Sequence, residues 1–135
     1  MKIYIKNNYM ICVQCVLLNE KGEVLGVSRK TDHSDMGLCG GKMDPEDNGT
    51  PMVTIIREAK EETGLDIKNL KLIHSGIYRG SLQYTYLADW DGEINTTEPH
   101  VVKWSTFEEL GRGSFGDYNL MIAEVLQKMQ VKFAS

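Results

Sequence analysis

The stretch Gly40–Leu65, GGKMDPEDNGTPMVTIIREAKEETGL, decides how this chain folds. It leads from a pair of glycines into a clearly bracketed helix. Thr50 suits the N-cap, Pro51 suits the first helical position, where a missing N–H breaks no hydrogen bond, and Gly64 suits the left-handed residue that ends a helix. We therefore expect a helix from Pro51 to Thr63.

Three glutamates share one stripe of this expected helix. At about 100° per residue, Glu61 and Glu62 lie within about 60° of Glu58, on opposite sides of it. The apolar residues beside the stripe, expected to dock the helix on a sheet, are Met52, Ile55, Ile56 and Ala59. Like charges at this spacing repel, and the C-terminal end of a helix disfavours anions. A bound Mg²⁺ would relieve both effects. The alternative is a solvated acidic face neutralised by Arg57 and Lys60.

The sequence around the acidic stripe resembles the Nudix box of the MutT-like hydrolases. The matching pieces are Gly40-Gly41-Lys42, the Thr50-Pro51 helix start, and Arg57–Leu65, REAKEETGL. The family pattern is a glycine, five residues, a glutamate, seven residues, then Arg-Glu-U-x-Glu-Glu-x-Gly-U with U aliphatic. The resemblance implies a Nudix-type α/β/α sandwich, with the Nudix helix on one face of a mixed central sheet and a C-terminal helix.

The chain departs from the family pattern in the loop before the helix. Five residues after Gly41 the acidic position falls on Asp47, and two further residues are inserted before Arg57. We expect Asp47 to be the supporting acid that steadies Arg57. A turn-forming role for this aspartate is the alternative.

The resemblance also implies roles for individual residues. Glu61 and Glu62 match metal ligands, Glu58 matches a position used as ligand or base, and the backbone carbonyl of Gly40 matches a further ligand. Arg57 matches the residue that orients the first glutamate. The implied cofactor is Mg²⁺, with Mn²⁺ as a possible substitute. An unwound glycine pair would let the carbonyl approach the ion.

A further catalytic acid is expected in a loop after the central strands. Glu98, in the sequence Thr97-Glu98-Pro99-His100, resembles that acid in nucleoside triphosphate-cleaving members, and Glu93 is the fallback. Its alternative role is that of an exposed loop residue.

Substrate contacts are expected from the outer strands and loops. Arg29, Lys30 and Lys42 are placed to meet phosphate oxygens. Aromatic residues that could stack on a base are Tyr78, Tyr84, Tyr86, Trp90 and Phe115, of which we select Tyr84. The histidines His33, His74 and His100 show no ligand spacing and are interpreted as structural.

The rest of the chain interleaves expected strands and helices, which indicates an α/β (α+β) fold. Strands are expected at Ile3–Lys6, Tyr9–Leu18, Val24–Lys30, Leu70–Tyr78, Leu82–Ala88 and Val101–Trp104. The strand at Tyr9–Leu18 is apolar on both faces, which is typical of a central strand covered on both sides. A helical turn is expected at Thr106–Leu110, and an amphipathic helix, capped by Asp117, from Tyr118 onward.

Length and composition bound the function. The 135 residues are expected to form one domain, 1–135, and the net charge of −4 gives no general attraction to nucleic acid or to an anionic membrane. A phosphorylated ligand must then be held locally, through a metal. Cys12 and Cys15 form a C-x-x-C inside an apolar run, and with Cys39 they are expected to be reduced, buried thiols, which indicates a cytoplasmic protein.

These observations predict a Mg²⁺-dependent hydrolase of a nucleoside diphosphate linked to a group X. The favoured substrate is a nucleoside triphosphate, canonical or oxidised, cleaved to monophosphate and pyrophosphate. ADP-ribose, a dinucleoside polyphosphate or coenzyme A are alternative substrates, and a nucleotide-binding module without catalysis is an alternative of another class. The expected partner is this small-molecule nucleotide, and the protein is expected to be a monomer or homodimer.

Overall fold

The computed structural model describes residues 5–6, 9–47 and 49–135. The strands are β1 (Ile5–Lys6), β2 (Tyr9–Val16), β3 (Val24–Ser28), β4 (Met36–Lys42), β5 (Asp66–Tyr78), β6 (Ser81–Asp91) and β7 (Val102–Ser105). The helices are the 3₁₀ turn η1 (Pro45–Asp47), α1 (Pro51–Thr63), α2 (Phe107–Leu110) and α3 (Gly116–Lys128). Within the described ranges, no helix combines the length and the apolar character that a membrane crossing requires.

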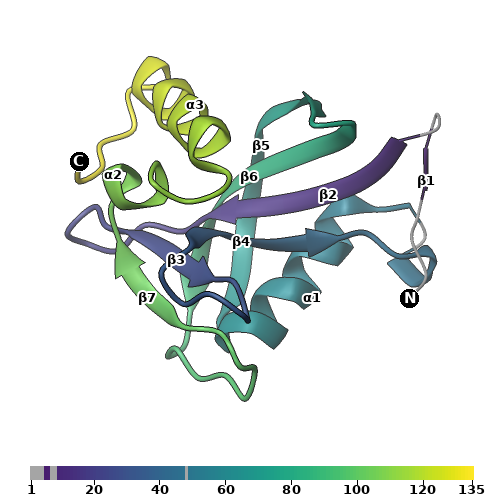
Figure 1. Cartoon of the computed structure of the whole chain (residues 1–135), viewed down its shortest axis with the longest axis horizontal. Helices are drawn as coiled ribbons and strands as arrows, with labels where there is room; N and C mark the ends of the chain where they lie inside the picture. The colour runs from purple at the N-terminus through teal and green to yellow at the C-terminus, as the bar shows by residue number, and fades with distance from the viewer. Residues whose placement is uncertain (1–4, 7–8, 48) are drawn as a thin grey trace.

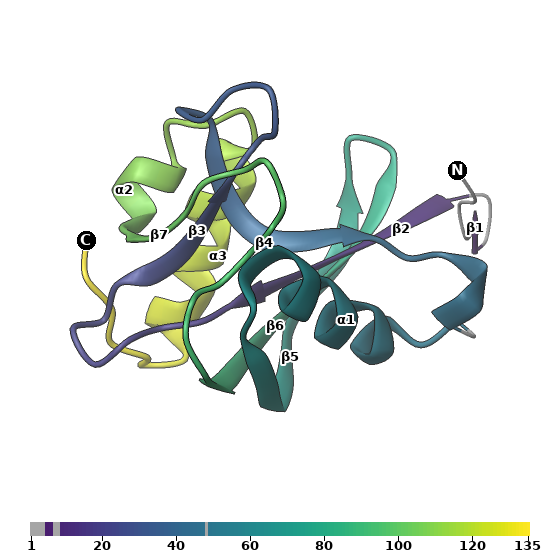
Figure 2. The same cartoon turned by 90° about the horizontal axis from the view of Figure 1, so that it is seen from below.

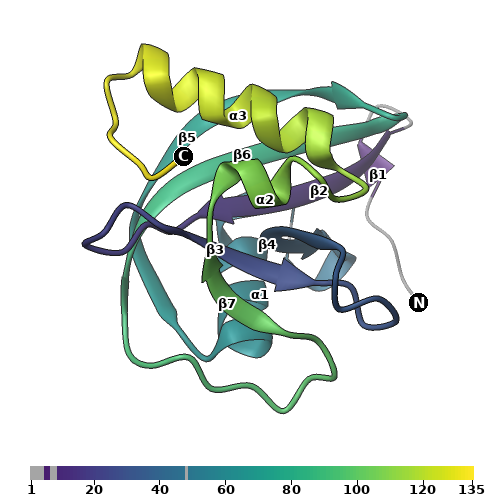
Figure 3. The ribbon, with the colours of Figure 1, turned by 60° about the vertical axis from the view of Figure 1, so that its left-hand side comes forward.

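The strands form one mixed sheet in the order β5-β6-β2-β4-β3-β7, with β1 paired to the start of β2. β2 runs parallel to β6 and antiparallel to β4. Helix α1 covers one face, and α2 and α3 cover the other (Figures 1 and 3). Seen from below, α1 lies in front of the sheet (Figure 2). The expected mixed sheet between helical layers is confirmed.

Each face of the sheet has its own hydrophobic core. On the α1 side, Ile55 and Ala59 of the helix pack on Val13 of the central strand, and all three are fully buried. On the other side, Ile122 of α3 and Leu110 of α2 are likewise buried. Full burial of one such aliphatic side chain stabilises the fold by about 1.5–3 kcal/mol.

Helix α1 begins and ends where the sequence predicts. Pro51 is its first residue, and Gly64 follows it with a left-handed φ of 83°. The expected docking face was partly wrong, because Met52 and Ile56 are 42% and 43% exposed. The buried stripe is narrower than expected, since the sheet contacts the helix along Ile55 and Ala59.

The largest difference from expectation is strand β4. The sequence indicated a loop and an unwound glycine pair, but Gly40 and Gly41 are strand residues that pair with Gln14 and Val13 of β2. The sequence signal was weak because glycine is a poor strand former. Pairing with β2 on one side and with β3 on the other determines the strand.

Several element ends also differ from expectation. β2 ends at Val16, and its second face is only partly covered, because Met10, Cys12 and Gln14 are partly exposed. β5 begins at Asp66, four residues earlier than expected. The N-cap of α3 is Phe115, whereas Asp117 accepts a hydrogen bond from the Tyr78 hydroxyl. Of the expected strand at Ile3–Lys6, residues 3 and 4 lie outside the described residues.

Candidate active site

The carboxylates on α1 lie against the glycine pair of β4. Oε1 of Glu62 accepts hydrogen bonds from the backbone N–H of Gly40, at 3.0 Å, and from the thiol of Cys39, at 3.3 Å. A Cβ added to Gly41 would lie only 2.8 Å from Oε2 of Glu58. The absence of a side chain on Gly41 therefore makes the space that the carboxylate of Glu58 occupies.

Burial disfavours the charge on two of these acids. It raises the pKa of Glu62 to about 7 despite the hydrogen bonds from Cys39 and Gly40, and the nearby Glu58 and Glu98 add to the increase. Burial is also the main reason that the pKa of Glu58 is raised. Both carboxylates are therefore in an environment that a cation would make more favourable.

Arg57 is surrounded by carboxylates. Its guanidinium donates to both oxygens of Asp47, at 3.1 and 3.4 Å, and to Glu58 at 3.1 Å. Longer bonds of 3.4 Å reach Asp44 and Glu61. This arrangement links the loop before α1 to the acidic stripe of the helix.

Asp47 is 4% exposed and ends the 3₁₀ turn that the inserted loop forms. Burial alone would raise the pKa of its carboxyl, but hydrogen bonds from Arg57 and Thr54 hold that pKa below its usual range. The contact expected between Asp47 and Arg57 is thus present, and the longer loop supplies it without breaking the helix start.

The donor set fits a hard divalent cation, although Arg57 occupies part of it. In the parts of the chain that the structure describes, no three His, Cys, Asp or Glu side chains lie close enough together to hold a metal as they stand. Arg57 takes up one oxygen of Glu58 and both oxygens of Glu61. The carboxylates supply oxygen ligands of the kind that Mg²⁺ prefers, and the pKa values raised by burial indicate charge that a cation would neutralise.

The remaining expected charged residues lie around this cluster at different distances. Glu98, in the loop between β6 and β7, is 3.5 Å from Nζ of Lys30 and close enough to Glu62 to raise its pKa. Glu93 is exposed in the same loop. Arg29 is an exposed side chain whose Nε lies 3.9 Å from Asp35.

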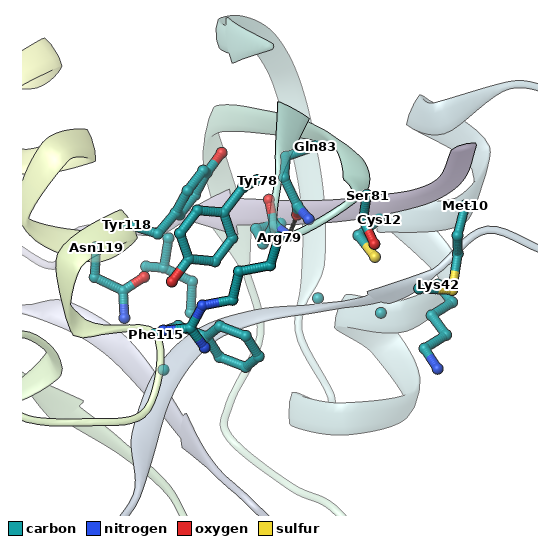
Figure 4. A pocket seen from close by; sticks show the side chains of 15 residues that line it. Met10, Cys12, Lys42, Tyr78, Arg79, Ser81, Gln83, Phe115, Tyr118 and Asn119 are labelled. Atoms are coloured by element: carbon teal, nitrogen blue, oxygen red, sulfur yellow. Dashed lines mark hydrogen bonds between the residues drawn. The ribbon is translucent and has the colours of Figure 1, made fainter. Parts of the chain in front are cut away.

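A pocket of about 390 Å³ opens on the other face of β4. Its lining residues are Met10, Cys12, Gln14, Gly37, Leu38, Gly40, Gly41, Lys42, Tyr78, Arg79, Ser81, Gln83, Phe115, Tyr118 and Asn119. Figure 4 shows Lys42 and Met10 at one end, and Tyr78, Arg79 and Phe115 at the other. Since Gly40 and Gly41 line the pocket and also touch the carboxylates, the pocket adjoins the acidic cluster.

The far end of the pocket is aromatic. The guanidinium of Arg79 lies 4.9 Å from the ring centre of Tyr78 and 5.5 Å from that of Phe115. Both rings were among the expected base-stacking residues. Tyr84, the residue selected from the sequence, does not line the pocket and packs on the α1 side of the sheet.

Sequence reasoning missed the polar floor of this pocket. Nε2 of Gln14 donates to Gln83, and the hydroxyl of Thr85 donates to Oε1 of Gln14 and bonds the Tyr118 hydroxyl at 2.6 Å. The available signal was the alternation of Ser81, Gln83 and Thr85 in β6. Polar side chains on a strand face that a helix covers require hydrogen-bond partners, so their presence there indicates a polar network.

The comparisons with known proteins agree with this geometry. A family model described as the NUDIX domain matches residues 8–124. The chain therefore belongs to the Nudix family, whose hydrolases generally use divalent metal ions. A comparison with curated proteins found no match.

Solved structures of hydrolases share the fold at low sequence identity. An ADP-ribose pyrophosphatase from Streptococcus suis has a TM-score of 0.72 at 16% identity, covering 93% of this chain and 96% of its own. A MutT structure from work on Aliivibrio salmonicida and Vibrio cholerae has a TM-score of 0.69 at 18% identity, and the match covers 89% of this chain and 98% of that one. A MutT Nudix hydrolase from Burkholderia pseudomallei has a TM-score of 0.66 at 23% identity, and the match covers 83% of this chain and 95% of that one. Together with the family model, these neighbours support a Nudix pyrophosphohydrolase.

Proposed function

We propose that this protein is a Mg²⁺-dependent hydrolase of nucleoside triphosphates, canonical or oxidised, that releases the monophosphate and pyrophosphate. The observation that carries the proposal is the position of the glycine pair. One side of Gly40 and Gly41 contacts Glu58 and Glu62, and the other side lines an aromatic pocket. Among the described strands, Gly40 and Gly41 pair with β2 only, because β3 pairs with β4 no further than Leu38. A single ligand could therefore reach around this edge of β4 from the carboxylates into the pocket.

The residues that would hold the cation are Glu58, Glu61, Glu62 and the backbone carbonyl of Gly40, with Mg²⁺ preferred and Mn²⁺ as a substitute. When bound, the cation neutralises the pyrophosphate and lowers the pKa of the attacking water. In the proposed reaction the water oxygen bonds to phosphorus, the bridging oxygen leaves with pyrophosphate, and a carboxylate accepts the water proton. We assign that carboxylate to Glu98, with Glu58 as the second candidate.

The other side chains would bind and orient. Arg57, held by Asp47, would set the position of Glu58. Lys42 lies at the end of the pocket nearest the glycine pair, where an ammonium group would meet phosphate oxygens. Tyr78 and Phe115 offer ring faces for a base at the far end. Arg29 does not line this pocket and lies beside Asp35, so its contact with phosphate stays a prediction from the sequence.

A substrate panel tests the proposal. Purified protein with millimolar Mg²⁺ is incubated with nucleoside triphosphates, ADP-ribose, dinucleoside polyphosphates and coenzyme A, and products are identified by chromatography. Monophosphate plus pyrophosphate from a triphosphate supports the proposal. Turnover of ADP-ribose alone would instead favour the activity named for the Streptococcus suis neighbour. A ligand-dependent rise in melting temperature with no product would make the protein a binding module.

A paired variant excludes a contaminating phosphatase from this panel. Glu61→Gln removes one proposed ligand charge with little change in volume, and turnover should fall by orders of magnitude. Glu108→Gln changes an exposed glutamate that pairs only with Arg112 among the described residues, and turnover should be kept.

The setting of this activity is also proposed. Free Cys12, Cys15 and Cys39 are compatible with a cytoplasmic protein. Monomer and homodimer are both compatible with a site whose proposed ligands come from one chain.

A further inference from the structure

The loop between β6 and β7 closes the C-terminal end of α1. The last carbonyls of an α-helix have no partner inside the helix, so they must find donors elsewhere. Three successive carbonyls of α1 are bonded by this loop. The bonds run from Thr96 Oγ1 to Glu61 O at 3.3 Å, from His100 Nε2 to Glu62 O at 3.2 Å, and from the Asn95 N–H to Thr63 O at 2.8 Å. Two of the proposed metal ligands, Glu61 and Glu62, thus lie in a turn that the loop holds.

His100 is the buried member of this set of donors. It is 7% exposed, whereas the Thr96 hydroxyl bond lies at the surface. Because a carbonyl oxygen only accepts, Nε2 of His100 must carry the hydrogen of this bond. The ring therefore holds the backbone of Glu62, and a histidine that the sequence suggested to be merely structural is in contact with the proposed metal site.

Cys39 holds the side-chain carboxylate of Glu62. Its thiol is fully buried and lies 3.3 Å from Oε1 of Glu62. Oε1 also accepts the N–H of Gly40. Among the described residues, the hydrogen bonds to this carboxylate all go to Oε1, which keeps Oε2 for another ligand.

We propose that Cys39 and His100 are positioning residues that hold Glu62 by its side chain and by its backbone, so that one carboxylate oxygen is kept for a divalent cation. The inference rests on the proposed function, in which Glu62 is a metal ligand. Neither residue lines the proposed substrate pocket. Partners that orient metal ligands typically change metal affinity by about 10–100-fold when they are removed.

The test measures Mn²⁺ binding to the full chain by the loss of the free-ion EPR signal. Cys39→Ala and His100→Ala should each weaken binding by about tenfold or more. Cys39→Ser and His100→Gln keep a donor at nearly the same place and should recover much of the affinity. A purely structural role would not distinguish variants by the donor that they retain.

Two further variants serve as controls. Ile55→Val removes one fully buried heavy atom from the α1-side core, as Cys39→Ala does, and leaves the hydrogen bonds of Glu62 in place. His33→Ala removes an exposed ring that bonds the same loop through the Pro99 carbonyl at 2.9 Å, so it controls for the loss of a loop hydrogen bond. Both should bind Mn²⁺ like the unaltered protein. Equal weakening in Ile55→Val and Cys39→Ala would overturn the inference, because the loss would then come from the cavity.

Glu62→Gln separates this inference from the proposed function. If Glu62→Gln loses Mn²⁺ while Cys39→Ala and His100→Ala keep it, the positioning roles are wrong and the metal ligand stands. If Glu62→Gln binds Mn²⁺ normally, the metal assignment itself fails, and the inference with it. Melting temperatures identify any alanine variant that does not fold, and the donor-retaining variants then decide.

Discussion

Asp47 joins an irregular loop to the charged face of α1. Its two carboxylate oxygens accept from Arg57, and Thr54 on the helix also bonds to it. A buried carboxylate is stable only when it is paired in this way. The loop insertion therefore changes the path of the chain while keeping the acid beside the arginine.

Asp47→Asn should lower the free energy of unfolding by about 2 kcal/mol at pH 7, because hydrogen bonds to charged groups contribute about that much. The pKa of Asp47 is below its usual range, so its stabilisation is present above about pH 4 and is lost as the pH falls through the lowered value. Urea denaturation at pH 7 and at pH 3 measures both effects. Asp44→Asn, which changes a more exposed partner of Arg57, should cost less. Equal losses at both pH values would contradict the assignment.

Gly41 illustrates a position where a single methyl group matters. In the strand it has an ordinary φ, so alanine is compatible with its backbone, but a Cβ would lie 2.7 Å from Cδ of Glu58. Gly41→Ala should therefore fold, displace the carboxylate and lower turnover at least tenfold. Gly76→Ala, in β5, would meet only the movable ring of His74 and should keep turnover. Steady-state kinetics with the best substrate of the panel measure the difference.

At the scale of elements, α1 and the loop after β6 form one unit. The N–H of Asn95 donates to the carbonyl of Thr63, and Gly64 packs so closely on Asn95 that a Cβ at this position would clash with the Asn95 carbonyl oxygen. The end of the helix and the start of the loop thus have room only for glycine.

Gly64→Ala should destabilise the protein by about 3 kcal/mol, because the left-handed backbone alone costs about 1–2 kcal/mol and the clash with Asn95 adds to it. Gly80→Ala is the matched control, since Gly80 has a similar φ of 79° and nothing within 4 Å of its Cβ position. It should lose only about 1 kcal/mol. Chemical denaturation measures the free energy of unfolding of both variants. Equal decreases would show that contact with the loop adds nothing to the cost at Gly64.

At the scale of the whole molecule, the two halves of the site lie on opposite faces of the sheet and meet at an edge of β4. The carboxylates lie on the α1 side, and the pocket lies on the side of α3, with the glycines of β4 between them. Cation binding on one side should therefore affect the stability of the entire fold, because Glu62 is buried against the central strands.

Without a cation, the folded protein should lose stability as the pH rises from about 4 to 7. Burial raises the pKa of Glu62 to about 7, so over this range the unfolded chain is ionised at this residue and the folded one is not. Mg²⁺ should then raise the melting temperature more at pH 8, where the carboxylate is ionised, than at pH 6, where a proton competes. Scanning fluorimetry with EDTA or Mg²⁺ measures this shift. In Glu62→Gln the difference between the two pH values should disappear.

The helix could be predicted from the sequence because its signals are local. Pro51 and Gly64 bracket α1 through their own backbone preferences, and the three glutamates share a stripe because a helix has a fixed period. The family resemblance of the Gly40–Leu65 stretch rests on the same local spacing, and the family model agrees with it.

The tertiary structure alone decided what each element faces. It paired Gly40 and Gly41 into β4, left Met52 and Ile56 exposed, turned Tyr84 away from the pocket and brought His100 to the backbone of Glu62. Strand pairing and face coverage depend on contacts between residues far apart in the chain, whereas caps and helical periodicity act within a few residues. For this reason the sequence determined the helix and its acidic stripe, and the packing of the sheet determined the pocket and the groups that hold the stripe in place.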